Sequence, residues 1–159
     1  MNRHLVPLGC LVLVAGLGFT PPAAALQEEA SRPELCTISD AVVIAEVTSS
    51  EVAWTEDAEG GIVRRVWFAL SIGLRGDAPE TLEVLLPGGQ IAGLHYKVED
   101  SPEQLRLDRR YLLFLDLNKD GSYSVVGGEA GAVLVAQPGD GDGERFIDAV
   151  ASVGVCDAQ

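Results

Sequence analysis

Apolar and polar residues alternate most regularly over residues 66–74. One face of an extended chain there would carry Val66, Phe68, Leu70, Ile72 and Leu74, and the other Trp67, Ala69, Ser71 and Gly73. A period of two residues, with β-branched and aromatic side chains, is typical of a β-strand that has one face against a core. We therefore predict a long strand over this stretch.

Further apolar stretches also predict strands, and turn residues separate them. They cover residues 41–48, 81–86, 111–115 and 122–126, with a short addition at 132–136. The stretches at 41–48 and 111–115 consist mostly of consecutive apolar residues, as in strands buried on both faces. Residues 90–108 show no regular pattern. Several short strands separated by turns predict a small closed or partly closed β-barrel.

The sequence predicts one helix, over residues 144–153. Their apolar positions, Phe146, Ile147, Val150 and Val153, have the spacing of one helix face. The helix would be short and would close the domain at its C-terminal end.

The first 25 residues have the pattern of a cleavable secretory signal peptide. Arg3 begins it, an apolar run covers residues 5–19, and Ala23–Ala25 supplies the small residues of a cleavage site. The run is shorter than the roughly 20 residues that a helix needs to span a bilayer. We expect export to the periplasm or the cell exterior, with a mature chain that is not embedded in the membrane. An uncleaved anchor and a lipid anchor on Cys10 are the alternatives.

The chain after residue 25 predicts one domain. Residues 26–35 are polar and predict a loose leader, and residues 36–159 predict a single barrel domain. This part holds all 24 acidic residues and all but one of the 11 basic ones, and the whole chain has a net charge of −13. Such acidity disfavours nucleic acid as a partner and favours cationic partners, although it also keeps an exported domain soluble.

Two cysteines, Cys36 and Cys156, remain after cleavage, one near each end of the domain. An isolated pair in an oxidising compartment most often forms a disulfide. The bridge would close a loop of about 120 residues and contribute roughly 4–5 kcal/mol in the chain-entropy model. Two free thiols are the alternative.

Catalytic chemistry has few candidate residues. His95 is the one histidine after residue 25, and no Gly-x-Ser-x-Gly motif is present. A zinc site needs three or four ligands, which one histidine and two bridged cysteines do not supply. We therefore expect no catalytic residue and no cofactor, with a secreted hydrolase that uses His95 as the less favoured alternative.

A segment from Asp116 to Gly121 matches the first half of a calcium-binding loop. Asp116, Asn118 and Asp120 place oxygen ligands at alternate positions before a glycine. The twelfth position of the loop is Gly127, where a glutamate is expected. A hairpin turn between two strands explains the same residues. A calcium-stabilised structural surface domain is thus a second alternative for the function.

Several short blocks resemble a pattern found in small secreted bacterial domains. The blocks are Cys36 with Ser39-Asp40-x-Val42-Val43, Pro87-Gly88-Gly89, Val98-x-x-Ser101-Pro102, Arg110-Tyr111-Leu112-Leu113-Phe114-Leu115, and Tyr123-x-Val125-Val126-Gly127-Gly128. A Gly-Glu pair usually precedes the Arg-Tyr of this pattern, whereas Asp108 and Arg109 stand here. The pattern carries no catalytic motif.

The opening block is also similar to the netrin-like domains, which include the tissue inhibitors of metalloproteinases. That resemblance implies a barrel of the oligonucleotide/oligosaccharide-binding (OB) type. Those inhibitors chelate zinc through an N-terminal cysteine, but Cys36 lies inside the expected mature chain. The fold expectation is therefore a mainly β, five- or six-stranded OB-like barrel with a short C-terminal helix. The functional expectation is an exported, non-catalytic module that binds another secreted or envelope protein, such as a protease.

Overall fold

The computed structural model describes residues 30–55, 61–102, 105–137, 139, 141 and 143–154. In chain order, its elements are α1 (Arg32–Ile38), β1 (Ala41–Trp54), β2 (Ile62–Arg75), β3 (Thr81–Pro87), β4 (Gly89–Ile91), β5 (Leu94–Tyr96), β6 (Arg110–Leu117), β7 (Tyr123–Val125), the 3₁₀ helix η1 (Gly128–Gly131), β8 (Ala132–Ala136), β9 (Glu144–Arg145) and α2 (Phe146–Val153). The expected signal peptide lies outside the described residues.

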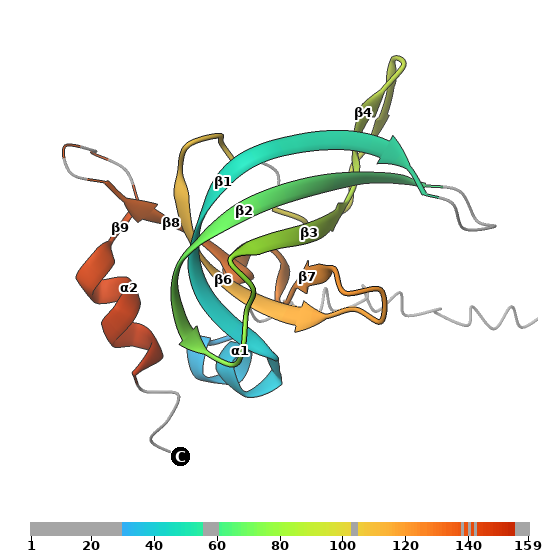
Figure 1. Ribbon diagram of the computed structural model, residues 1–159. Coiled ribbons are helices and arrows are strands. Elements are labelled where there is room, and N and C mark those ends of the chain that lie inside the picture. Colours follow the sequence, from blue (N-terminus) through green and yellow to red (C-terminus); the bar gives the residue numbers. More distant parts are fainter. Residues whose placement is uncertain are drawn as a thin grey trace, which may run out of the picture.

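Five strands close into a barrel in the order β1–β2–β3–β7–β6, and β6 pairs back onto β1 (Figure 1). The β3–β7 pair is parallel, and the other pairs that close the barrel are antiparallel. A five-stranded barrel with this order and one parallel pair has the OB topology. The predicted mainly β, OB-like barrel with a short C-terminal helix is confirmed.

Two apolar clusters explain why β1 and β6 are buried on both faces. Inside the barrel, side chains such as Phe68 and Leu113 are fully buried. On the other side of the same strands, Ile44 and Phe114 pack under the two helices. Consecutive apolar residues in these two strands are therefore required, as the sequence predicted. The predicted core face of β2 holds at its start but not at Ile72, which is 38% exposed.

The predicted loose leader is wrong from Arg32 onward, because α1 begins there. The backbone N–H and the hydroxyl of Ser31 both donate to the Glu34 carboxylate, at 2.8 and 2.7 Å. Pro33 stands in the first turn, where its missing N–H has no cost. Cys36, where the barrel domain was predicted to begin, lies in this helix.

The C-terminal helix is shorter than predicted. Glu144 and Arg145 form β9, which pairs in parallel with β8, and α2 begins at Phe146. The Arg32 guanidinium donates to the Glu144 carboxylate through both terminal nitrogens, one of them at 2.8 Å, so the two ends of the described chain are joined. Neither α-helix of the described chain is long and apolar enough to cross a membrane.

The stretch 90–108, predicted to be irregular, contains the β4–β5 hairpin. Ala92 and Gly93 form its two-residue turn, with φ angles of 49° and 81°. Turns with two positive φ angles match the twist of paired strands. The pattern was missed because alanine replaces the asparagine or aspartate that usually marks such a turn.

Candidate functional site

The β1–β2 hairpin is longer than the barrel requires. Each of the two strands has 14 residues, but β6 pairs only with Ala41–Glu46 of β1. Among the described strands, the remaining part of β1 extends past β6 and pairs only with β2, which itself pairs with β3 as far as Val63, and the end of this hairpin lies beside the β4–β5 hairpin (Figure 1). Two hairpins that are far apart in sequence thus meet at one end of the molecule.

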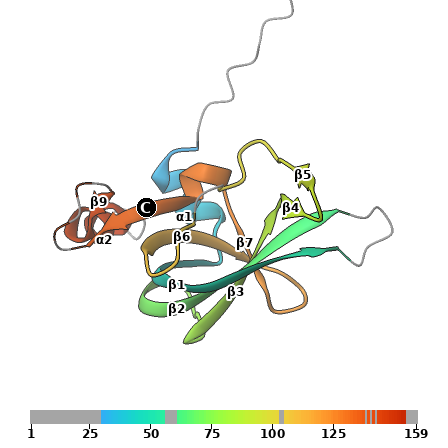
Figure 2. The ribbon, with the colours of Figure 1, turned by 90° about the horizontal axis from the view of Figure 1, so that it is seen from above.

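The contact between the hairpins depends on a glycine. The Gly88 N–H donates to the Ile62 carbonyl at 2.8 Å, which ties the start of the second hairpin to β2. A Cβ atom on Gly89 would lie 2.8 Å from Val52 Cγ1 and 3.3 Å from Ile62 Cγ2. The backbone of β4 therefore lies directly on the side chains of the β1–β2 hairpin. Figure 2 shows the same crossing from above.

Three large apolar side chains are exposed where the hairpins meet. Trp54 is 51% exposed, Leu94 56% and Tyr96 50%. Trp54 is the cross-strand partner of Ile62, which packs against Gly89, and Gly89 is the partner of Tyr96. Trp54 and Tyr96 therefore lie near each other, and Leu94 lies on the same face of β5 as Tyr96, two residues nearer the hairpin turn. We call Trp54, Leu94 and Tyr96 the hairpin platform. Apolar side chains that are exposed together, unlike single ones, mark interaction surfaces.

Helix α2 also exposes two apolar residues, but they do not form a comparable patch. Phe146 is 40% exposed and Ile147 70%. Both belong to the predicted apolar face of α2, but they lie about 100° apart around the helix axis, and no third large apolar side chain of the described α2 is exposed beside them. Both views place α2 and the β4–β5 hairpin at opposite ends of the molecule (Figures 1 and 2).

A cavity of about 300 Å³ lies beside the hairpin platform. Its lining includes Arg64, His95, Lys97 and Ser101, and none of its described lining residues is acidic. Arg64 donates to the Pro102 carbonyl, and the Ser101 hydroxyl donates to the Pro87 carbonyl at 2.9 Å. These bonds anchor the loop after β5 to the barrel.

His95 is exposed on β5 and lines this cavity. A hydrolytic histidine needs a carboxylate to orient it and a nucleophile within hydrogen-bond reach. The described lining of the cavity supplies no carboxylate. The hydrolase alternative that uses His95 stays a prediction.

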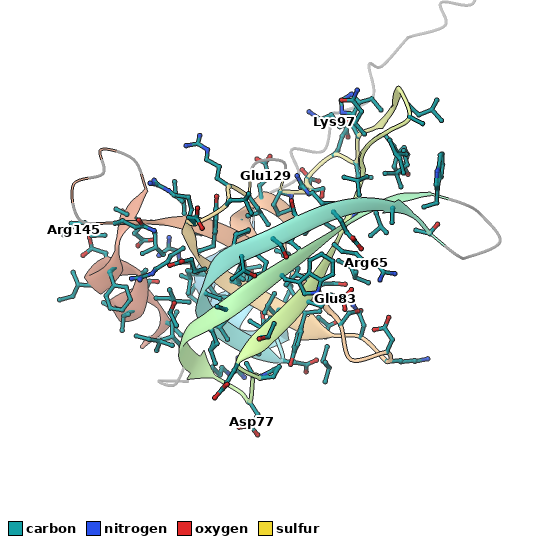
Figure 3. The ribbon with its side chains drawn as sticks, turned by 45° about the horizontal axis from the view of Figure 1, so that its top comes forward. Arg65, Asp77, Glu83, Lys97, Glu129 and Arg145 are labelled. Carbon is teal, nitrogen blue, oxygen red and sulfur yellow. The ribbon has the colours of Figure 1, made fainter. Side chains whose placement is uncertain are left out.

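The outer face of the sheet formed by β1, β2 and β3 is charged. Arg65 on β2 and Glu83 on β3 form an ion pair at 3.6 Å, and both lie on this face in Figure 3. Glu51 of β1 is the cross-strand partner of Arg65. Glu51, Arg65 and Glu83 therefore form a row of alternating charge across β1, β2 and β3. The row ends at β1 with the Glu51 carboxylate.

The calcium candidates lie in the β6–β7 turn. The Asp120 carboxylate accepts hydrogen bonds from the Ser122 N–H and hydroxyl, at 3.0 and 2.6 Å, and these bonds lower the pKa of Asp120. The Asn118 side chain donates to the hydroxyls of Ser122 and Ser124. No group of three acidic, histidine or cysteine residues that could hold a metal occurs among the described residues. Calcium binding here stays a prediction, and the geometry accounts for Asn118 and Asp120 as turn residues.

Asp116, the third calcium candidate, lies beside Asp40, for which the sequence pattern predicts no site. Asp40 accepts a hydrogen bond from the Leu117 N–H at 2.9 Å, and this bond and the contact with Asp116 lower the pKa of Asp40. The hydrogen bond to Asp40 raises the pKa of Asp116. One proton shared between the two carboxyl groups accounts for the opposite directions.

Asp116→Asn should raise the melting temperature at neutral pH and have little effect near pH 3. The folded protein holds the Asp116 proton more tightly than the unfolded chain. The stabilisation that protonated Asp116 contributes is fully present below the ordinary pKa of an aspartate. It is lost as the pH rises through the raised pKa of Asp116. The asparagine amide would still donate to Asp40 but would carry no charge. Thermal unfolding at the two pH values checks this, and an unchanged or lower melting temperature at pH 7 would contradict it.

Cys36 is buried, with 1% of its surface exposed. It packs in the cluster that contains Val153 at the end of α2. Cys156 follows three residues later but lies outside the described residues. The pairing of the two cysteines therefore stays a prediction, which the contact between α1 and α2 supports.

Gly89→Ala should cost about 1–3 kcal/mol of stability and displace the β4–β5 hairpin. The glycine has a φ of +143°, which side chains rarely adopt, and a Cβ would meet Val52. Gly93→Asn is the control, because nothing lies within 4 Å of its Cβ position and asparagine tolerates a positive φ. Urea unfolding checks both variants. Equal stabilities of the two would show that the hairpin does not depend on this close approach.

Comparison with protein-family models finds no match to this chain. A search of curated proteins also finds none. The fold and the surface by themselves define the class of this protein, which is an OB-like barrel that exposes an apolar platform on two hairpins.

Proposed function

We propose that this protein is an exported, non-catalytic binding module whose hairpin platform binds another secreted or envelope protein. The observation that carries the proposal is the joint exposure of Trp54, Leu94 and Tyr96. Tryptophan and tyrosine are the residues most enriched at the energetic centres of protein interfaces. In OB barrels the loop between the first two strands is one of the segments that bind ligands, and Trp54 stands at the start of that loop here.

The charge of the chain and the predicted export define the partner further. A net charge of −13 favours a partner with a basic surface and disfavours nucleic acid. The signal-peptide pattern of residues 1–25 supports an encounter outside the cytosol. The resemblance to netrin-like domains suggests a co-secreted protease as one partner of this kind.

The test uses purified, oxidised residues 26–159 as bait for the secreted and periplasmic proteins of the native host. The expected result is a stoichiometric partner, identified by mass spectrometry, that the wild-type bait retains. The double variant Trp54→Ala/Tyr96→Ala should lose it, because both side chains are half-exposed and their removal leaves the core intact. Capture of nothing by the wild type, or equal capture by the double variant, would refute the proposal.

A further inference from the structure

Strand β1 changes its neighbours at a bulge. The Val47 N–H donates to the Arg109 carbonyl, and the Asp108 N–H donates to the Val47 carbonyl, both at 3.0 Å. The register between β1 and β2 then shifts between Val47 and Ser49. After this bulge no strand of the described chain pairs with the side of β1 that faces away from β2. We call that side of residues 48–54 the open edge.

The hydrogen-bond alternation shows which backbone groups point to the open edge. The Thr55 N–H donates to the Gly61 carbonyl at 2.8 Å, so the polar groups of Thr55 point toward β2. Polar groups of successive residues in an antiparallel pair point in alternate directions. The N–H and C=O groups of Ser50, Val52 and Trp54 therefore point away from β2. A strand edge with such groups is a template for pairing with another chain.

The side chains beside the open edge define the sequence that fits it. Val52 and Trp54 lie on the face that the β4–β5 hairpin crosses, so this end of the edge is apolar on that face, with Arg64 behind Val52 on β2. Glu51 lies on the opposite face and ends the row of alternating charge that includes Arg65 and Glu83. A strand added to this edge would place apolar side chains beside the hairpin platform and a basic side chain opposite Glu51.

We propose that the open edge of β1 binds an extended segment of the partner, with alternating apolar and basic residues, by antiparallel strand addition. The inference rests on the proposed function and names the way in which the partner is held. Main-chain hydrogen bonds to Ser50, Val52 and Trp54 supply affinity, and the side chains at alternate positions supply specificity. Antiparallel pairing continues the arrangement of β1 with its two existing neighbours.

A second copy of this chain is a poor occupant of the same edge. Two copies would each bring a net charge of −13. The register that pairs residues 48–54 of one copy with the same residues of the other would also place the two Glu51 side chains directly opposite each other. Like charges at neighbouring positions destabilise a sheet. A basic segment of another protein avoids the repulsion between two acidic chains. It also places a positive charge, rather than a second Glu51, opposite Glu51.

The test titrates residues 26–159 with the peptide acetyl-Val-Lys-Val-Lys-Val-Lys-Val-amide by calorimetry, and follows amide NMR signals. Residues opposite Val52 in antiparallel pairing share its face and point their N–H toward β1. N-methylation of the valines should therefore abolish binding, whereas N-methylation of the lysines should leave it. The peptide with glutamate in place of lysine should bind at least about tenfold more weakly.

Matched protein variants test the same contact from the other side. Ser50→Pro removes an N–H that the β1–β2 ladder does not use, and Ser50→Ala keeps it. Both should fold, as thermal unfolding shows, and only the proline variant should lose the peptide and the captured partner. Absence of peptide binding up to about 1 mM, or equal binding by the two methylated peptides, would overturn the inference. A partner retained equally by both Ser50 variants would overturn it while leaving the proposed function intact.

Discussion

Replacement of Cys156 by alanine should lower the free energy of unfolding by about 4–5 kcal/mol under oxidising conditions. The predicted bridge to Cys36 joins the two ends of the domain, so its loss frees a loop of about 120 residues in the unfolded chain. Cys36 is buried in the cluster that contains Val153, where α2 ends three residues before Cys156. Urea unfolding with and without reductant measures the effect.

The control for this prediction is the double variant Cys36→Ala/Cys156→Ala. Both variants lose the same covalent bond, so the double variant should be only slightly less stable than Cys156→Ala. The small additional cost in the double variant reports only the packing of the Cys36 side chain. If the proteins carry two free thiols, Cys156→Ala will be nearly neutral and reductant will have no effect on the wild type.

Phe68→Ala should cost about 3–5 kcal/mol, because it opens a cavity in the middle of the barrel. Phe68 has no exposed surface, and its cross-strand partners Val47 and Leu82 are also fully buried. Strands enclose the cavity left by Phe68→Ala on all sides, so neighbouring side chains cannot easily move in to fill it. The midpoint of urea unfolding should fall while the slope of the transition stays unchanged.

Trp67→Ala is the matched comparison for Phe68→Ala. Trp67 is the next residue along β2 and lies on the outer face, where its side chain is partly exposed. It should therefore cost clearly less, although tryptophan is the larger side chain. A larger loss for Trp67→Ala than for Phe68→Ala would mean that the two faces of β2 are assigned the wrong way round.

Much of the fold could be predicted because burial leaves a direct trace in the sequence. Strands β1 and β6 lie between the barrel interior and the helices, so consecutive apolar residues appear in both. Helix α1 was missed although the sequence contained its signal. Ser31 and Glu34 have the capping-box spacing, and Pro33 stands in the first turn, but β-branched residues after Cys36 favoured a strand.

The candidate site could not be predicted for a different reason. Exposure of Trp54 and Tyr96 depends on how the β4–β5 hairpin crosses β1 and β2, and no local pattern encodes that crossing. The same limit applies to the pair formed by Asp40 and Asp116, which the barrel closure brings together from distant positions. Local patterns show which residues are buried in strands, whereas the closed barrel determines which exposed residues become neighbours.

The role of the hairpin platform is tested first by the affinity of the captured partner for three forms of the protein. Calorimetry should show one-to-one binding by the wild type and at least about a tenfold loss for Trp54→Ala/Tyr96→Ala. Ile147→Ala, which removes a more exposed side chain at the opposite end of the molecule, should bind within about twofold of the wild type. A loss with Ile147→Ala and none with the double variant would place the binding surface on α2 and contradict the role of the hairpin platform.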